Sequence, residues 1–146
     1  MGVSSFGDCP LVQGQLVQLD ASTGAIQHTF DVVPAGCTGG SMWSSPVVDQ
    51  AAGTIYIATG NGGKCATAEL YGQALVQLRA SDLTALSSWQ VPQSALTGDS
   101  HFGGSPTLFQ ATIGGVSHAL VGVVNKNGLY YAFDRGLEER RRTPEI

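Results

Sequence analysis

A seven-residue segment of this chain occurs twice, and this repeat limits what the chain can fold into. Residues 16–22 read Leu-Val-Gln-Leu-Asp-Ala-Ser, and residues 75–81, 59 positions later, read Leu-Val-Gln-Leu-Arg-Ala-Ser. A Ser-Pro pair recurs at nearly the same distance, at 45–46 and 105–106, and residues 128–134 echo residues 14–20. A period of this size is typical of solenoids, propellers and other arrays of one structural unit.

Period-2 alternation with β-branched residues predicts short strands along most of the chain. Gly-containing dipeptides such as Asn61-Gly62 and Asn127-Gly128 separate them, because glycine supplies the positive φ of tight hairpin turns. No segment of ~12 residues shows a 3.6-residue period with caps, so the expected fold class is all-β. The nine expected strands are 15–20, 26–32, 45–49, 54–59, 74–79, 86–91, 105–109, 118–124 and 129–134.

One whole repeat is expected to form a four-stranded antiparallel meander that starts at the Ser-Pro strand. A single meander cannot bury both of its faces, and radial stacking of such sheets is the β-propeller. At roughly 50–60 residues per blade and ~4–8 blades per ring, the 146 residues hold about two and a half blades. We therefore expect an incomplete propeller over residues 1–135, as a piece of a longer protein. Closure as a sandwich or by oligomerisation is the structural alternative.

The charge pattern argues against a nucleic-acid surface, because phosphate binding needs clustered Lys and Arg. The net charge is −4, and the one basic run, 140–142, lies beside two acids in residues 136–146, which are expected to be a charged C-terminal tail. No run of ~18 apolar residues predicts a membrane span. Residues 1–6 lack the pattern of a signal peptide. A periplasmic or extracellular protein would carry a leader that is absent from this chain.

The three cysteines allow one disulfide and leave one cysteine over. Cys9, Cys37 and Cys65 follow each other at intervals of 28 residues, without a Cys-x-x-Cys motif or a nearby His pair, so a zinc site has little support. Their spacing does not decide the pairing. A Cys37–Cys65 bond is one open possibility, provided that the compartment is oxidising.

Four segments in a fixed order carry a family resemblance. They are residues 19–24 (Leu-Asp-Ala-Ser-Thr-Gly), 43–49 (Trp-Ser-Ser-Pro-Val-Val-Asp), 55–61 (Ile-Tyr-Ile-Ala-Thr-Gly-Asn) and 125–135 (Asn-Lys-Asn-Gly-Leu-Tyr-Tyr-Ala-Phe-Asp-Arg). As a set, over residues 3–135, they resemble the quinoprotein-type β-propellers with PQQ repeats, such as bacterial alcohol and polyvinyl-alcohol dehydrogenases. The resemblance implies an eight-bladed or closely related propeller that carries pyrroloquinoline quinone (PQQ) in its central funnel.

The resemblance also implies which residues contact the cofactor. Residues 125–128 are similar to the family segment in which a Lys or Arg reaches the quinone oxygens, so Lys126 is the main expected contact, with Asn125 and Asn61 as further cofactor-binding residues. Asn61 matches a funnel-facing family Asn that can ligate a metal. Calcium accompanies the cofactor in this family and needs a carboxylate ligand, for which Glu69 is the only nearby acid. From the residues alone, Lys126 can also be an exposed lysine in a hairpin turn, and Asn61 can be an ordinary turn residue. No metal site is predicted.

Two family features are missing from the chain. Family dehydrogenases place a catalytic aspartate shortly before the strand that matches residues 74–76, whereas this chain has Glu69. Glu69 is the expected substitute base, and a surface-loop glutamate is the other interpretation. The adjacent-cysteine pair of some members is also absent.

Two further positions differ in ways that bear on packing and on the funnel. His28 and Ser87 stand where an aromatic residue usually ends the last strand of a blade, and Trp89 follows two residues later, so the docking of blades is expected to be modified. The polar loop before the second Ser-Pro strand resembles an Asp-rich stretch in relatives; a funnel-facing pair of Asp99 and His101 is one interpretation of it, and an ordinary loop histidine is the other.

Three functions remain open at this stage. The first is a fragment of a quinoprotein oxidoreductase that oxidises a small-molecule alcohol and passes electrons to PQQ, with the remaining blades of the parent propeller as partners. The second is a non-catalytic propeller that serves as a protein-interaction scaffold, which the missing aspartate favours. The third is an incomplete gene product without a function of its own.

Overall fold

Apart from one three-residue 3-10 helix, the regular secondary structure of the described residues is antiparallel β-sheet, which confirms the expected fold class. The computed structural model describes residues 1–5, 11–63, 65 and 70–137. Within that part the structure holds ten strands, a three-residue 3-10 helix and no α-helix. The elements are β1 (Gly2–Val3), β2 (Gln15–Leu19), β3 (Ile26–Asp31), β4 (Val47–Asp49), β5 (Thr54–Ala58), β6 (Ala74–Arg79), β7 (Ala85–Gln90), η1 (Gln93–Ala95), β8 (Thr107–Ile113), β9 (Val116–Val124) and β10 (Tyr130–Asp134).

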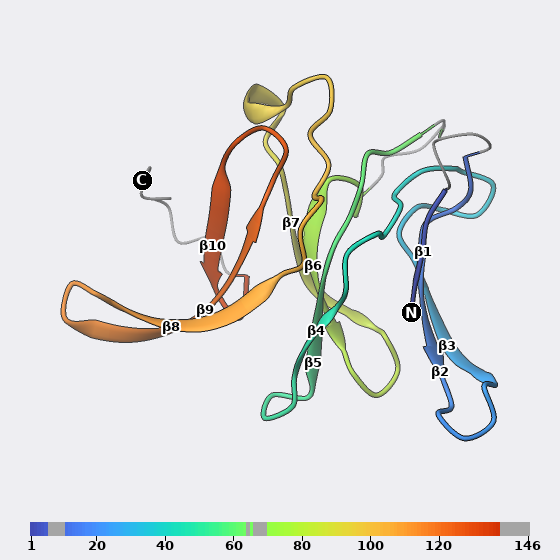
Figure 1. Cartoon of the computed structure of the whole chain (residues 1–146), viewed down its shortest axis with the longest axis horizontal. Helices are drawn as coiled ribbons and strands as arrows, with labels where there is room; N and C mark the ends of the chain where they lie inside the picture. Colours follow the sequence, from blue (N-terminus) through green and yellow to red (C-terminus); the bar gives the residue numbers. More distant parts are fainter. Residues whose placement is uncertain (6–10, 64, 66–69, 138–146) are drawn as a thin grey trace.

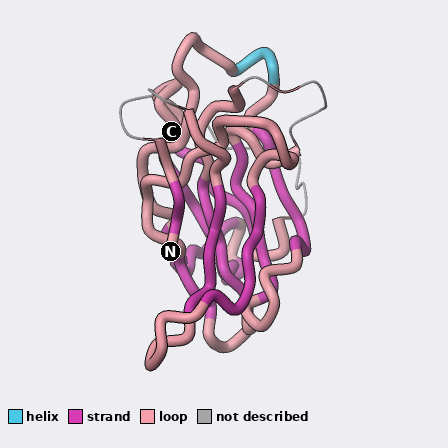
Figure 2. Tube along the Cα trace, turned by 90° about the vertical axis from the view of Figure 1, so that its right-hand side faces the viewer, coloured by secondary structure: helices cyan, strands magenta, loops and turns pink. Residues whose placement is uncertain are grey.

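The strands form three separate sheets that follow each other along the chain. Their strand orders are β1-β2-β3, β4-β5-β6-β7 and β10-β9-β8, and every neighbouring pair is antiparallel. Figure 1 shows them in order from the blue N-terminal sheet to the orange C-terminal sheet, with no closed ring. Figure 2 shows the strands running roughly along one direction, with the connecting loops at the two ends. The middle sheet is the complete four-stranded meander expected from the sequence.

The middle sheet buries both of its faces. Alternation along β5 sends Ile57 toward the first sheet and Tyr56 toward the third, and alternation along β6 does the same with Val76 and Leu75. All four side chains are at most 1% exposed. Burial of this kind is the main driving force for stacking the sheets, since each face alone would leave apolar surface in water.

Aromatic contacts at both interfaces explain how the blades dock without the usual aromatic residue. The ring of Trp89 on β7 lies 4.6 Å from that of Tyr131 and 4.8 Å from that of Phe133, both on β10. Phe30 on β3 lies 5.1 Å from Tyr71 at the other interface. Trp89 and Phe30 each stand two residues after the altered positions, Ser87 and His28. The docking aromatic is therefore displaced by two residues, which keeps it on the same face of its strand.

A buried ion pair joins the second and third sheets at the end opposite the pocket described below. Arg135, just after β10, places its Nη1 2.7 Å from Oδ2 of Asp49, and the Asp49 side chain is 6% exposed. The Tyr56 hydroxyl donates a hydrogen bond to the backbone carbonyl of Arg135 and accepts one from Gln77. Desolvation is the main cause that raises the pKa of Tyr56. The ion pair connects residues 86 positions apart, and the Tyr56 bond to Arg135 connects residues 79 positions apart.

The predicted domain boundary at residue 135 remains a prediction. Leu137 is buried in the interface between the second and third sheets, and residues 138–146 of the expected tail lie outside the described part of the chain. Among the described residues, no helix has the length and hydropathy needed to cross a membrane.

Replacing Arg135 by Ala tests the role of the buried ion pair. We expect Arg135→Ala to lower the free energy of unfolding by about 2 kcal/mol, because Asp49 would stay buried without its partner while the Arg135 site is partly exposed. Urea denaturation measures this loss. The control is Arg79→Ala, which breaks an exposed pair with Asp82 and should cost less than about 0.5 kcal/mol. Equal losses in the two variants would contradict the assigned role.

Candidate functional site

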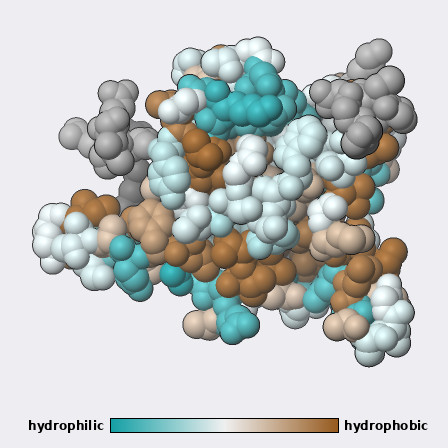
Figure 3. All heavy atoms as spheres, viewed as in Figure 1, coloured by the Kyte–Doolittle hydropathy of each residue, from teal (hydrophilic) through white to brown (hydrophobic). Residues whose placement is uncertain are grey.

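The loops at one end of the three sheets enclose a pocket of about 610 Å³. Its lining comes from five connections and includes Leu11, Ser41, Trp43, Asn61, Asp99, His101 and Lys126, together with several glycines. Figure 3 shows hydrophilic residues gathered at the upper edge of the molecule, where these loops lie, and hydrophobic ones along the strands below. The fold thus brings together residues that are up to 115 positions apart in the sequence.

Lys126 reaches the pocket from the tight turn between β9 and β10. The Asn125 N–H donates to the Leu129 carbonyl, and Gly128, at φ +90°, completes the turn with a conformation that other residues adopt only under strain. The Lys126 N–H donates to the His101 carbonyl at 3.2 Å, so the turn is held against the loop before β8. Lys126 is therefore a turn residue and a pocket residue at the same time.

Asn125 supports this arrangement from beneath. Its side chain is 2% exposed, and its Nδ2 donates to the Ser100 carbonyl at 2.7 Å. Its Oδ1 accepts a hydrogen bond from the Asn127 N–H at 2.9 Å. The structure places the carboxamide of Asn125 in the joint between the two loops, where it positions Lys126.

A carboxylate lies between two basic side chains at the pocket. Oδ2 of Asp99 is 3.0 Å from Nζ of Lys126, and Oδ1 is 2.9 Å from Nδ1 of His101. The hydrogen bond from Lys126 is the main cause that holds the pKa of Asp99 below its ordinary value of 3.8. The charge of His101 and a hydrogen bond from Asn61 lower this pKa further.

Trp43 supplies an aromatic surface on the pocket wall. Its ring lies 5.1 Å from the His101 ring, at an interplanar angle of 51°. Trp43 is 43% exposed, whereas the His101 side chain is 11% exposed. An exposed indole beside charged groups is suited to stacking against a planar ligand.

Asn61 enters the wall from the connection between β5 and β6. Its Oδ1 accepts a hydrogen bond from Nε2 of Gln73 at 2.9 Å, and its backbone carbonyl accepts one from the Gly40 N–H at 2.7 Å. Thr59, two residues before it, is fully buried and binds the Tyr71 carbonyl and the Ala74 N–H through its hydroxyl. These bonds determine where the loop turns and thus where the carboxamide of Asn61 lies.

The sequence-predicted site residues divide into three groups. Lys126, Asn61 and the Asp99–His101 pair come together in one pocket, and Asn125 lies just behind it. Glu69, the expected base, lies outside the described residues. The sequence did not single out Trp43 as a site residue, although its position just before a Ser-Pro strand is a usable signal. The carboxylate found beside Lys126 comes from the loop before β8, and not from the segment before β6 where the family resemblance located an aspartate.

Comparison with solved structures identifies the architecture. A quinohemoprotein alcohol dehydrogenase from Pseudomonas putida superposes with a TM-score of 0.75 and 22% identity, over 86% of this chain and 23% of its own. The fold is that of part of a β-propeller. The quinohemoprotein alcohol dehydrogenase of Comamonas testosteroni gives a TM-score of 0.73, 22% identity and coverage of 86% and 24%. The chain thus spans about a quarter of the length of these structures. No family model and no curated protein matches its sequence.

Replacing Lys126 by Met tests the electrostatics of the pocket. A hydrogen bond from Lys126 lowers the pKa of Asp99 in the folded chain. This bond therefore stabilises the folded chain at a pH above the ordinary pKa of an Asp, and the stabilisation is lost as the pH falls through the lowered pKa of Asp99. We expect Lys126→Met to raise the pKa of Asp99 toward 3.8. Carboxyl ¹³C NMR titration measures it.

Asp20 is the internal control for this titration. Its pKa of about 2 is set first by the side-chain hydrogen bond from Ser22 and then by bonds from Thr23, in a different turn. It should therefore be the same in both proteins. An Asp99 that titrates identically with and without Lys126 would show that the ion pair does not form in solution.

Proposed function

We propose that this chain is part of a PQQ-binding β-propeller oxidoreductase that oxidises a small-molecule alcohol. The observation that carries the proposal is the pocket in which the Lys126 ammonium, the Asp99 carboxylate and the Trp43 ring lie together. The order of motifs along the sequence and the likeness of the fold to two quinohemoprotein alcohol dehydrogenases support it.

The pocket residues fit the chemistry of PQQ. PQQ is a planar aromatic ortho-quinone that carries carboxylates, and a volume of about 610 Å³ lies within the range of pockets that hold such ligands. Trp43 offers an aromatic face, and Lys126 offers an ammonium for the oxygen atoms of an anionic, electron-accepting ring. When bound, PQQ would accept two electrons from the alcohol carbon.

Among the described residues, Asp99 is the group best placed to accept the alcohol proton. Its lowered pKa keeps the carboxylate ionised at neutral pH, and His101 Nδ1 holds one of its oxygens in position. If Lys126 turned toward a bound anion, Oδ2 of Asp99 would lose a hydrogen-bond donor, and the pKa of Asp99 would rise. The same lysine would then hold the cofactor and leave a stronger base for the substrate hydroxyl.

The described residues do not fit a calcium site. Calcium prefers six to eight oxygen ligands, usually including carboxylates. Asn61 Oδ1 already accepts a hydrogen bond from Gln73, and both oxygens of Asp99 contact basic side chains. Over residues 1–5, 11–63, 65 and 70–137, no group of three or more His, Cys, Asp or Glu comes close enough to hold a metal ion.

The disulfide and the outer sheet faces bear on location and partners. Cys37 and Cys65 form a disulfide, which supports a periplasmic or extracellular location because such bonds persist in oxidising compartments. Ile26, Val124 and Tyr130 are 68%, 49% and 47% exposed on the two outer sheets. Further blades of a longer propeller would cover this apolar surface, as the middle sheet is covered here.

Replacing Lys126 by Ala tests cofactor binding. We expect Lys126→Ala to weaken PQQ binding by about 10- to 100-fold, since a hydrogen bond to a charged group contributes about 1.5–3 kcal/mol. Isothermal titration of PQQ into the wild-type chain and the variant measures this, and Arg79→Ala is the control because Arg79 pairs with Asp82 outside the pocket. A wild-type chain that does not bind PQQ would contradict the proposal and favour the scaffold function.

Replacing Asp99 by Asn tests the proton acceptor. In the full protein, we expect Asp99→Asn to lower the rate of alcohol-dependent dye reduction by about 10²- to 10⁴-fold, the usual contribution of a general base. PQQ affinity should change by less than about threefold, because Asn keeps the shape and an oxygen acceptor. Unchanged turnover in Asp99→Asn would show that another group, such as Glu69, accepts the proton.

A further inference from the structure

Three loops meet behind the pocket in a short backbone ladder. Gly40 and Gly63 donate to the carbonyls of Asn61 and Thr38 at 2.7 and 2.9 Å, and Gly60 donates to that of Ser41 at 2.8 Å. On the other side, residues 12–14 pair with Gly39 through bonds of 2.8 and 2.9 Å. Residues 38–41 are therefore the central strand of this ladder, and Asn61 belongs to one of its edges.

The ladder is built mainly of glycine, so side-chain packing contributes little to its stability. A Cβ on Gly39 would lie 2.3 Å from the Gly63 nitrogen, and one on Gly14 would lie 2.0 Å from the Gly40 carbonyl oxygen. Such close approach requires glycine, and glycine loses more conformational freedom on folding than any other residue. Hydrogen bonds alone would therefore hold the ladder weakly.

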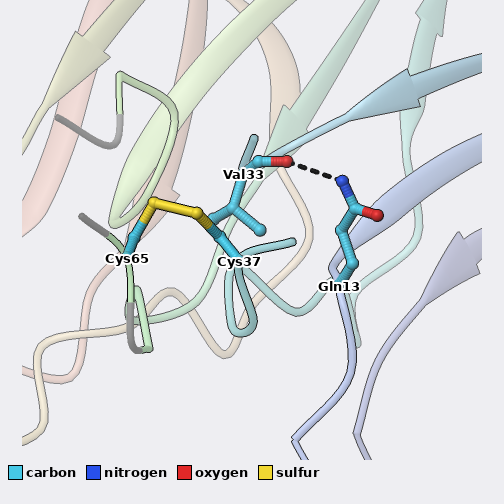
Figure 4. The surroundings of a disulfide bond; sticks show 4 residues. All are labelled: Gln13, Val33, Cys37 and Cys65. Atoms are coloured by element: carbon cyan, nitrogen blue, oxygen red, sulfur yellow. Dashed lines mark hydrogen bonds between the residues drawn. A yellow bond between two sulfur atoms is a disulfide. The ribbon is translucent and has the colours of Figure 1, made fainter. Parts of the chain in front are cut away.

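A covalent bond closes one end of the ladder. Cys37 immediately precedes the ladder residue Thr38, and Cys65 follows Gly63 by two positions, so their disulfide joins the two strands that carry Ser41 and Asn61. Figure 4 shows the bond between these two loops, with Gln13 from a third loop donating through Nε2 to the Val33 carbonyl at 2.8 Å. Both cysteines are partly exposed, so a reductant can reach the bond.

We propose that the Cys37–Cys65 disulfide positions Asn61 in the pocket wall and that its reduction weakens ligand binding without unfolding the sheets. A dithiol reductant would break the S–S bond in a two-electron step, leaving thiols on Cys37 and Cys65 and a disulfide in the reductant. The ladder then loses its covalent closure, while the buried apolar side chains of β5 and β6 keep their contacts, because Cys37 only borders one of these cores. Asn61 becomes mobile, and the pocket loses a defined wall.

Amide hydrogen exchange tests the positioning without any ligand. The variant carries Cys37→Ser and Cys65→Ser together in a Cys9→Ser background, and Cys9→Ser alone is the control that keeps the bond. We expect the amides of Gly40, Gly60 and Gly63 to exchange at least about tenfold faster in the variant, while amides of β5 and β6 keep their rates. Dithiothreitol should produce the same change in the control. Unchanged ladder rates, or equal acceleration of β5 and β6, would overturn the proposal.

Titration with PQQ tests the consequence for binding and rests on the proposed function. We expect the Cys37→Ser, Cys65→Ser variant to bind PQQ about tenfold more weakly than the Cys9→Ser control, with no thiol present in the titration because thiols reduce quinones. Asn61→Ala should weaken binding in the control but add little in the variant. Equal affinity of the control and the variant would overturn the positioning role and leave the proposed function intact. If neither form binds PQQ, the proposed function fails, and the exchange rates alone decide the positioning.

Discussion

Both faces of the middle sheet are covered by apolar side chains of its neighbours, and the rest of the structure depends on this packing. Ile57 and Tyr56 point in opposite directions from one strand, so β5 contributes to two cores at once. Stacking the sheets in this way brings their connecting loops to a common end. The pocket exists because these loops have neighbours on either side, and it would lose its walls if the interfaces came apart.

Most of the fold was predictable because it is periodic. Alternation located nine strands, and the echo of 16–22 in 75–81 identified the repeated sheet. The hairpin at Gly114-Gly115 is longer than expected, because β8 continues to Ile113 and β9 begins at Val116. The side chains of Ile113 and Val116 are both exposed, so this part of the hairpin lacks the apolar-polar alternation that predicts a strand. β1 was missed because a strand of two residues, Gly2–Val3, has no pattern to read.

The sequence singled out some of the residues that line the pocket, but it did not indicate their contacts. The resemblance singled out Lys126 and Asn61, because turn motifs survive when side-chain packing changes. The pairing of Lys126 with Asp99, 27 residues away, depends on the packing of the β9–β10 turn against the loop before β8. Sequence spacing carries no such information. Sequence spacing also left the pairing of the three cysteines open, with Cys37–Cys65 as one possibility. The structure confirms the Cys37–Cys65 bond.

Crystals of the chain soaked with PQQ test the central claim most directly, because they show where the ligand lies and which residues touch it. The account predicts density for PQQ in the pocket between the Trp43 ring and the Lys126 ammonium, with Lys126 turned away from Asp99. Density for PQQ elsewhere on the molecule, or a pocket in which Lys126 still contacts Asp99 at saturating PQQ, would contradict it.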